Sequence, residues 1–131
     1  MRTDLGWRGA AAQRQERPIT LTLTYPPSAN RLWRNYRGVT CKSDEYKAWL
    51  SLNAGLCSAY WNRKLDGPYR LTILATPPDR RARDLDNLAK PCGDFLQSIG
   101  LVTNDKHMRE LSMAWSDGPG AGVTCTVEPL L

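Results

Sequence analysis

The sequence predicts an α/β protein of the α+β kind, with a small mixed β-sheet of about four strands packed with two main helices. Four short apolar segments have the length and composition of strands, and two longer segments repeat apolar residues at helical spacing. The chain has 131 residues, of which 41% are hydrophobic, so it can form one domain with a modest core. We assign residues 18–131 to that domain. Residues 1–17 show no apolar period and are expected to form a flexible N-terminal arm, which is either an added segment or a DNA-contacting tail.

The first half of the domain is expected to contain a strand, a loop and a long helix. Residues 19–25 alternate apolar and polar side chains, which indicates a strand, and Pro26-Pro27 ends it. Residues 28–42 are expected to form a loop. Ser43 is a suitable N-cap, and apolar residues then recur at helical spacing, so we predict a helix over residues 44–64.

The second half is expected to add three strands and a helix. Residues 69–75 indicate a strand, closed by Pro77-Pro78. A helix is predicted over residues 86–99, with Gly100 as its C′ residue, although Pro91 should remove one backbone donor and kink it. Residues 108–116 and 121–128 are typical of a hairpin around the turn at 117–120.

Composition excludes several classes of protein. No apolar stretch reaches the roughly 18 residues that a membrane helix needs, and no signal-peptide pattern is present, so we expect a cytoplasmic protein without a membrane partner. The four cysteines are widely spaced and only one histidine is present, which favours free thiols over a zinc site. The net charge of +5 favours an anionic partner.

Acidic residues beside an arginine cluster carry most of the functional information. Asp84 and Asp86 follow Arg80-Arg81-Ala82-Arg83, and Asp105 comes after the second predicted helix. Uncompensated carboxylates repel phosphate, but with Mg²⁺, which prefers carboxylate oxygens, they would attract it. The pattern indicates metal-dependent cleavage of nucleic acid phosphodiesters. The alternative is structural, with Asp86 as a helix cap and surface acids paired with the arginines.

Further side chains could serve such a reaction. Lys90 follows Asp86 at i+4 and Asp94 follows at i+8, so the three share one helix face, with Asn87 beside them. A cation at Lys90 could stabilise developing charge on the phosphate. In the loop 28–42, basic side chains alternate with the aromatic residues Trp33 and Tyr36. Such a mixture suits contacts with phosphates and stacking on nucleobases. The alternative is a solvated loop whose aromatic side chains are buried in the core.

Three motifs together resemble the RusA-type Holliday junction resolvases, whose members are of phage or prophage origin. They are Pro26-Pro27-Ser28-Ala29-Asn30-Arg31, then Arg83-Asp84-Leu85-Asp86-Asn87-Leu88-x-Lys90 followed by Asp94, and the segment from Gly100 to Asn104-Asp105. The match spans about residues 18–128. The chain departs from the family pattern at Asn104, where a second acid is frequent, and at Pro91-Cys92-Gly93, which interrupts a smoother helical run.

The resemblance implies a cytoplasmic, bacterial or phage-encoded homodimer that cleaves four-way DNA junctions by paired symmetric nicks. It implies Mg²⁺, with Mn²⁺ as a substitute ion, and no small-molecule organic cofactor. The implied catalytic residues are Asp84, Asp86, Asp105 and Lys90, the three acids binding the metal, with Asn87 and Asp94 as supporting residues. The expected DNA-binding residues are Asn30, Arg31, Arg34, Arg37, Lys42, Arg80, Arg81 and Arg83. The alternatives are a DNA-binding protein of the same fold that no longer cuts, and a basic RNA-associated protein without catalysis.

Overall fold

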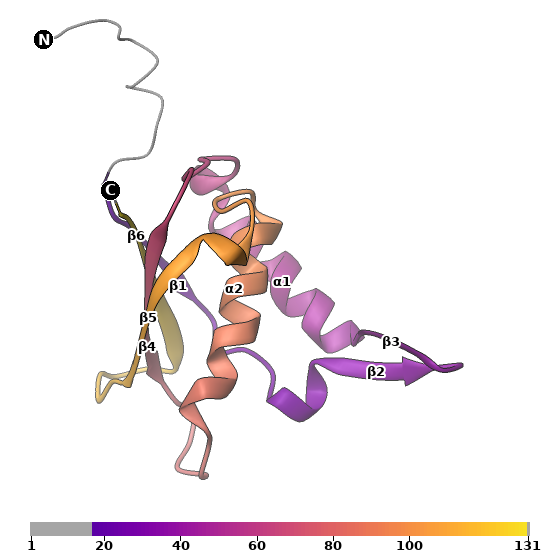
Figure 1. The fold of residues 1–131 in the computed structure, drawn as a ribbon. Coiled ribbons are helices and arrows are strands. Elements are labelled where there is room, and N and C mark those ends of the chain that lie inside the picture. The colour runs from indigo at the N-terminus through magenta and orange to yellow at the C-terminus, as the bar shows by residue number, and fades with distance from the viewer. Residues whose placement is uncertain (1–16, 131) are drawn as a thin grey trace, which may run out of the picture.

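The computed structural model of the protein describes residues 17–130, apart from the side chain of Asp105. The predicted N-terminal arm therefore lies outside the described residues, except for Arg17. The described chain forms a four-stranded mixed sheet, a separate two-stranded ribbon and two α-helices, which confirms the predicted α+β class (Figure 1). None of its helices within residues 17–130 has the length and apolar character needed to span a membrane.

Four strands build the main sheet in the order β1, β6, β4, β5. Their bounds are β1 Ile19–Leu23, β6 Gly122–Pro129, β4 Tyr69–Thr76 and β5 Met108–Trp115. β6 is antiparallel to both β1 and β4, with Leu21 and Ile73 each opposite Cys125. These three side chains are buried, whereas Thr20, on the other face of β1, is exposed. Period-2 alternation over residues 19–25 therefore correctly identified β1 and the face that it buries.

The predicted hairpin between the last two strands is wrong. β4 lies between β5 and β6, and β5 pairs with β4 in parallel, with Tyr69 beside Met108. A parallel pair needs a crossover connection, which the helix between the two strands supplies. β4 buries every second residue along its length and is a central strand with a partner on each edge. A turn-like sequence at 117–120 could not distinguish a tight hairpin from a connection that passes beyond β4.

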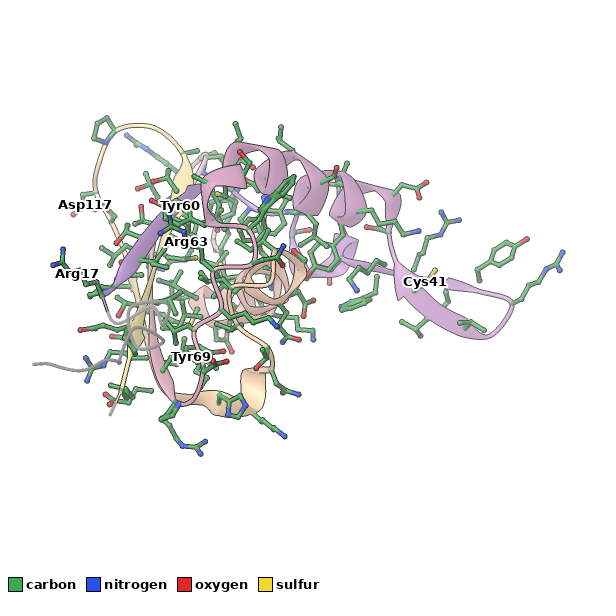
Figure 2. The ribbon with its side chains drawn as sticks, turned by 90° about the horizontal axis from the view of Figure 1, so that it is seen from above. Arg17, Cys41, Tyr60, Arg63, Tyr69 and Asp117 are labelled. Atoms are coloured by element: carbon green, nitrogen blue, oxygen red, sulfur yellow. The ribbon has the colours of Figure 1, made fainter. Side chains whose placement is uncertain are left out.

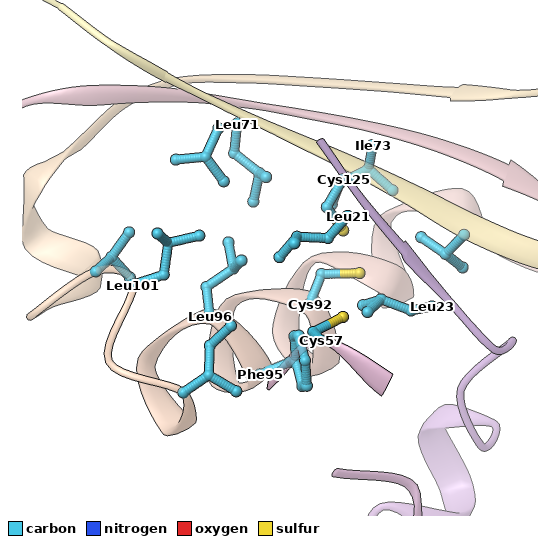
Figure 3. Packing of buried hydrophobic residues seen from close by; sticks show 14 of the residues in the cluster. Leu21, Leu23, Cys57, Leu71, Ile73, Cys92, Phe95, Leu96, Leu101 and Cys125 are labelled. Carbon is cyan, nitrogen blue, oxygen red and sulfur yellow. The ribbon is translucent and has the colours of Figure 1, made fainter. Parts of the chain in front are cut away.

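Both helices, α1 (Asp44–Leu56) and α2 (Ala89–Ser98), lie on one face of the sheet (Figure 1). Phe95 and Leu96 of α2 are fully buried and pack with Leu21 and Leu71 of the sheet (Figure 3). The thiols of Cys57, Cys92 and Cys125 lie in the same core, and all four cysteines are free, as predicted (Figure 3).

The helix α1 begins as predicted but ends early. The Ser43 hydroxyl accepts a hydrogen bond from the Tyr46 backbone N–H at 3.0 Å, which is the N-cap contact that the sequence indicates. The helix stops at Leu56 and a 3₁₀ turn, η3 (Ser58–Tyr60), follows, so the expectation of a helix to residue 64 is wrong. Gly55 weakens the helix near this end, and Asn62 adopts a positive φ of 59°, which a helix cannot accommodate.

The helix α2 also differs from its prediction. A 3₁₀ turn, η4 (Leu85–Leu88), precedes it, so the α-helix begins at Ala89 rather than near Asp86. Pro91 is then the third residue of the helix. The first backbone N–H groups of a helix lack an intrahelical partner, so proline is tolerated in the first turn. Pro91 therefore lies where its missing donor is tolerated, and not in the helix interior, where the longer predicted helix had placed it.

The segment predicted as a loop contains a β-ribbon. After a 3₁₀ turn, η2 (Ala29–Arg31), strands β2 (Trp33–Tyr36) and β3 (Val39–Lys42) pair antiparallel. Arg37 and Gly38 connect them, with φ values of 52° and 78°, the left-handed conformation that a two-residue hairpin turn requires. Figure 2 shows that the ribbon, which carries Cys41, projects away from the body of the protein.

Candidate functional site

A groove of about 700 Å³ brings two of the sequence motifs together. One wall is the segment 25–31, which contains the Pro-Pro-Ser-Ala-Asn-Arg motif. The other wall consists of Pro78, residues 81–84, Asn87 and Leu88, from the arginine and aspartate motif. Segments about 50 positions apart in the sequence thus form a single surface, as expected if both serve the same ligand.

The first wall is fixed to helix α1 through Thr24. The fully buried amide of Asn53 accepts a hydrogen bond from the Thr24 backbone N–H at 2.9 Å and donates one to the Thr24 hydroxyl at 3.0 Å. The Trp49 indole N–H donates to the Thr24 carbonyl at 2.9 Å. The chain therefore enters the groove from a rigid position, one residue before Tyr25.

The arginine loop on the second wall is organised by Asp79. Its carboxylate binds the guanidinium of Arg83 at 2.8 Å and that of Arg81 at 3.2 Å, and it accepts the Arg81 backbone N–H at 2.9 Å. The hydrogen bond from Arg83 is the main reason that the pKa of Asp79 lies well below its usual range. Arg83 also stacks over the ring of Tyr25, 5.6 Å from its centroid, which connects the two walls. Burial raises the pKa of the Tyr25 phenol more than this cation lowers it.

Asp84 and Asp86 are exposed and, among the described residues, form no ion pair. Arg81 and Arg83 bind Asp79 instead, so the interpretation of these acids as partners of the arginines is not supported. The interpretation of Asp86 as a helix cap also lacks support, because the residue at the N-cap position is Asp84 for η4 and Leu88 for α2, and neither forms a side-chain cap hydrogen bond. Asp84 and Asn87 line the groove, whereas Asp86, on the turn between them, does not.

The topology separates Asp105 from the other two acids. Because β4 and β5 are parallel, both strands begin at the same end of the sheet. Asp84 follows the far end of β4, whereas Asp105 opens the turn η5 (Asp105–His107) directly before β5. The ten residues of α2 run between the two positions and span about 15 Å. The backbone of one chain therefore keeps Asp105 away from Asp84. Among the described side chains, which do not include that of Asp105, no group of three metal-binding residues is found.

Lys90 lies in a small cluster outside the groove. Its ammonium binds Asp94 at 3.1 Å, and the Tyr46 hydroxyl donates to the same carboxylate at 2.6 Å. Burial and this hydrogen bond raise the pKa of Tyr46 far above that of a free phenol, so it remains a donor. The Lys90 ammonium also lies 5.9 Å from the centroid of the Trp33 ring. Asp94, expected to support the site, thus has a specific contact with its lysine.

The predicted DNA-binding residues separate into two surfaces. Asn30, Arg31, Arg81 and Arg83 line the groove. The ribbon carries Arg34, Arg37 and Lys42. Arg80 is exposed on the loop between β4 and η4 and does not line the groove.

The cations of the ribbon are only weakly engaged. Arg34 lies 3.7 Å from Asp44, with both side chains at least half exposed, and Arg37 lies 5.3 Å from the ring of Tyr36. Exposed pairs of this kind stabilise a protein little, so these cations remain available to a phosphate. Tyr36 is itself 56% exposed at the tip of the ribbon, which suits a stacking contact.

Sequence reasoning missed the functional context of Asp79, Tyr46 and Asn53. Asp79 has a local signal, because Arg83 follows it at i+4 and binds its carboxylate, but sequence reasoning considered only Asp84 and Asp86 beside the arginines. Tyr46 belongs to the apolar residues that recur at helical spacing after Ser43, and it is fully buried, yet its hydroxyl donates a hydrogen bond to Asp94. Nothing in the sequence indicates that Asn53 would meet Thr24 across 29 positions.

Comparison with known proteins supports the family resemblance. The family model described as endodeoxyribonuclease RusA matches residues 24–128. The crossover junction endodeoxyribonuclease RusA of Escherichia coli strain K12 is 39% identical over 87 residues, which cover 66% of this chain and 72% of that protein. The protein of the same name from Enterobacteria phage 82 is 38% identical over 86 residues, covering 65% and 72%. The matched region includes both walls of the groove and both helices, and the chain belongs to the RusA endodeoxyribonuclease family.

Proposed function

We propose that this protein is a Mg²⁺-dependent endodeoxyribonuclease that resolves four-way DNA junctions by paired, symmetric cleavage of two strands. The observation that carries the proposal is the pair of exposed acids, Asp84 and Asp86, which lack an ion-pair partner within the described chain although three arginines precede them. The relatives are named crossover junction endodeoxyribonucleases, which supports the junction as substrate. We place the reaction in the cytoplasm of a bacterium, with a phage as an alternative source of the gene.

The donor set fits a hard divalent cation. Asp84, Asp86 and Asp105 would hold it through carboxylate oxygens, the ligands that Mg²⁺ and Mn²⁺ prefer. Asp79 engages Arg81 and Arg83, so Asp84 and Asp86 form no ion pair with any residue in the described part of the chain. When bound, the ion would offset charge on the scissile phosphate and lower the pKa of a water.

The protein's own side chains would bind and orient the DNA. Arg31 and Arg81 at the groove would hold phosphates on either side of the cut, and Asn30 and Asn87 offer amide donors there. Lys90 would stabilise negative charge as it develops. The ribbon would hold a second segment of backbone through Arg34, Arg37 and Lys42.

The position of Asp105 supports a homodimer with shared sites. Asp84 and Asp105 of one chain lie at opposite ends of α2, so we propose that Asp105 of one subunit joins Asp84 and Asp86 of the other. Strand β5 is an edge of the sheet, and Leu111 and Trp115 on it are 43% and 39% exposed, which favours this side as the subunit contact.

A junction cleavage assay tests the activity. The substrate is a synthetic four-way junction with a mobile core and one end-labelled strand, and a linear duplex of the same sequence is the control. We expect symmetric nicks on the junction alone, only with Mg²⁺, and their loss in Asp86→Asn with binding retained. Tight junction binding without cleavage by the unaltered protein would instead support a DNA-binding protein of the same fold.

Subunit mixing tests the shared site. Asp86→Asn and Asp105→Asn dimers should each be inactive. If the sites are shared, a mixed dimer has one site with both substitutions and one intact site, and should nick one strand. If each chain carries a complete site, both sites of the mixed dimer are damaged and no nick appears, which would contradict the shared arrangement.

A further inference from the structure

The carboxylate of Asp94 is held in one orientation by two donors. Its Oδ2 accepts the Tyr46 hydroxyl at 2.6 Å, and its Oδ1 binds the Lys90 ammonium at 3.1 Å. Tyr46 is fully buried and the Asp94 side chain is only 16% exposed, so water competes weakly for the hydrogen bond between them, whereas the Lys90 side chain is 58% exposed. A short hydrogen bond to a charged acceptor is among the stronger polar contacts in proteins. Asp94 therefore fixes the end of an otherwise flexible lysine.

Trp33 completes the cluster from the ribbon. Trp33 is the first residue of β2. The centroid of its ring lies 5.9 Å from the Lys90 ammonium and 5.6 Å from the Lys42 ammonium. The rings of Trp33 and Tyr46 also pack edge to face, with 5.7 Å between their centroids. The base of the ribbon and the fixed ammonium of Lys90 thus share one aromatic ring.

The base of the ribbon is itself anchored at the start of α1. The Ser43 hydroxyl donates to the Arg31 carbonyl at 2.6 Å, and the Ser43 N–H donates to the Leu32 carbonyl at 2.9 Å. Trp33 follows directly, so a change in the direction of the ribbon would displace the ring against Tyr46 and Lys90.

From these contacts we infer that Tyr46, Asp94 and Trp33 are positioning residues, which hold the Lys90 ammonium for cleavage and couple its position to the DNA-gripping ribbon. The inference rests on the proposed function, since it concerns the lysine of that site. A lysine stem has four carbons and several rotamers, so an unheld ammonium would occupy the productive position only part of the time. Holding it before DNA binds reduces the ordering that the reaction step requires.

Tyr46→Phe is the discriminating variant. It keeps the ring that contacts Trp33 and stacks on Trp49 at 6.2 Å, and it removes only the hydroxyl. With saturating junction and Mg²⁺, we expect kcat to fall about tenfold, the effect of losing roughly one charge-assisted hydrogen bond. The junction Kd should change by less than about twofold, because Tyr46 is buried and does not meet DNA. Tyr60→Phe, the same change at a tyrosine outside the cluster, is the matched control.

A double-mutant cycle separates positioning from general destabilisation. In a Lys90→Ala background the hydroxyl has no ammonium to position, so Tyr46→Phe should leave the residual rate unchanged. Asp94→Asn, which keeps the shape of the side chain, should behave in the same way. Trp33→Leu should lower junction affinity as well as kcat, and its effect on kcat should also vanish without Lys90.

The outcomes are distinct. If the unaltered protein does not cut junctions, the proposed function fails and this inference fails with it. If the unaltered protein cuts and Tyr46→Phe matches Tyr60→Phe in kcat, the positioning role alone is overturned. An equal loss of rate from Tyr46→Phe with and without Lys90 would overturn it as well, since the hydroxyl would then act on the fold and not through the lysine.

Discussion

Replacing Asn53 with alanine should have two effects: it should destabilise the fold, and it should loosen the groove wall formed by residues 25–31. The side chain is fully buried and forms hydrogen bonds with the Thr24 N–H, the Thr24 hydroxyl and the Trp49 carbonyl. At about 1 kcal/mol for each hydrogen bond, Asn53→Ala should lower the free energy of unfolding by about 3 kcal/mol. For a domain of this size each kcal/mol shifts Tm by roughly 3–5 °C, so Tm should fall by about 10 °C.

Urea denaturation at neutral pH measures this effect, with Ser51→Ala as the control. Ser51 is two positions away on the exposed face of α1, and its substitution should change stability by less than about 0.5 kcal/mol. The groove wall formed by residues 25–31 follows Thr24, so junction affinity of Asn53→Ala should also weaken at temperatures where the variant is folded. A difference of less than about 1 kcal/mol between the two variants would refute the claim that this amide anchors the wall.

Three further predictions concern charge and backbone conformation. The pKa of Asp79 is lowered in the folded state, so its ion pairs contribute their full stability above the pKa of a free aspartate, near 4, and are lost as the pH falls further. When urea denaturation is repeated at decreasing pH, the free energy of unfolding of Asp79→Asn should therefore fall less than that of the unaltered protein. Gly55→Ala should stabilise the protein by about 0.5–1 kcal/mol, since nothing lies within 4 Å of the added methyl group. Gly100 has a φ of 74°, and an added methyl group would lie 2.5 Å from the side-chain oxygen of Asn62, so Gly100→Ala should destabilise the protein by more than about 1 kcal/mol. Thermal unfolding measures both. Replacing Arg34 and Arg37 by alanine should weaken junction binding and reduce its salt slope by about 2; an unchanged slope in fluorescence anisotropy would exclude the ribbon from phosphate contact.

The sequence predicted elements whose signal is local. Alternation over residues 19–25 identified one strand, and the segment 69–75 indicated another. Ser43 identified a helix start, because the hydrogen bond that caps a helix spans only three positions. The ribbon was missed because its strands have four residues each and its first strand is exposed throughout, so no burial pattern exists to be read. The pairing of the last two strands was missed because the order of strands depends on contacts between distant segments.

For the site, the sequence named acids and bases but could not assign partners among them. Arg81 and Arg83 precede two aspartates and follow a third, and spacing does not say which carboxylate they bind. The turn after β4 determines which carboxylate they bind. The Arg81 backbone N–H donates to the Asp79 carboxylate, and the guanidinium groups of Arg81 and Arg83 bind the same carboxylate. The consequence is electrostatic: one carboxylate engages these two cations and leaves Asp84 and Asp86 without an ion-pair partner among the described residues.

The separation of Asp105 from Asp84 also bears on the symmetry of cleavage in the proposed reaction. If each site needs acids from two subunits, a lone subunit holds an incomplete set of ligands, and assembly of the dimer completes two sites at once. Two sites related by a two-fold axis would meet two strands of a junction that has the same symmetry. An isolated chain on ordinary duplex would then bind through its arginines without cutting, because binding depends on cations within one chain and cleavage on acids from two. Paired cuts would thus have their physical origin in the parallel pairing of β4 with β5, which places Asp105 and Asp84 of one chain at opposite ends of α2.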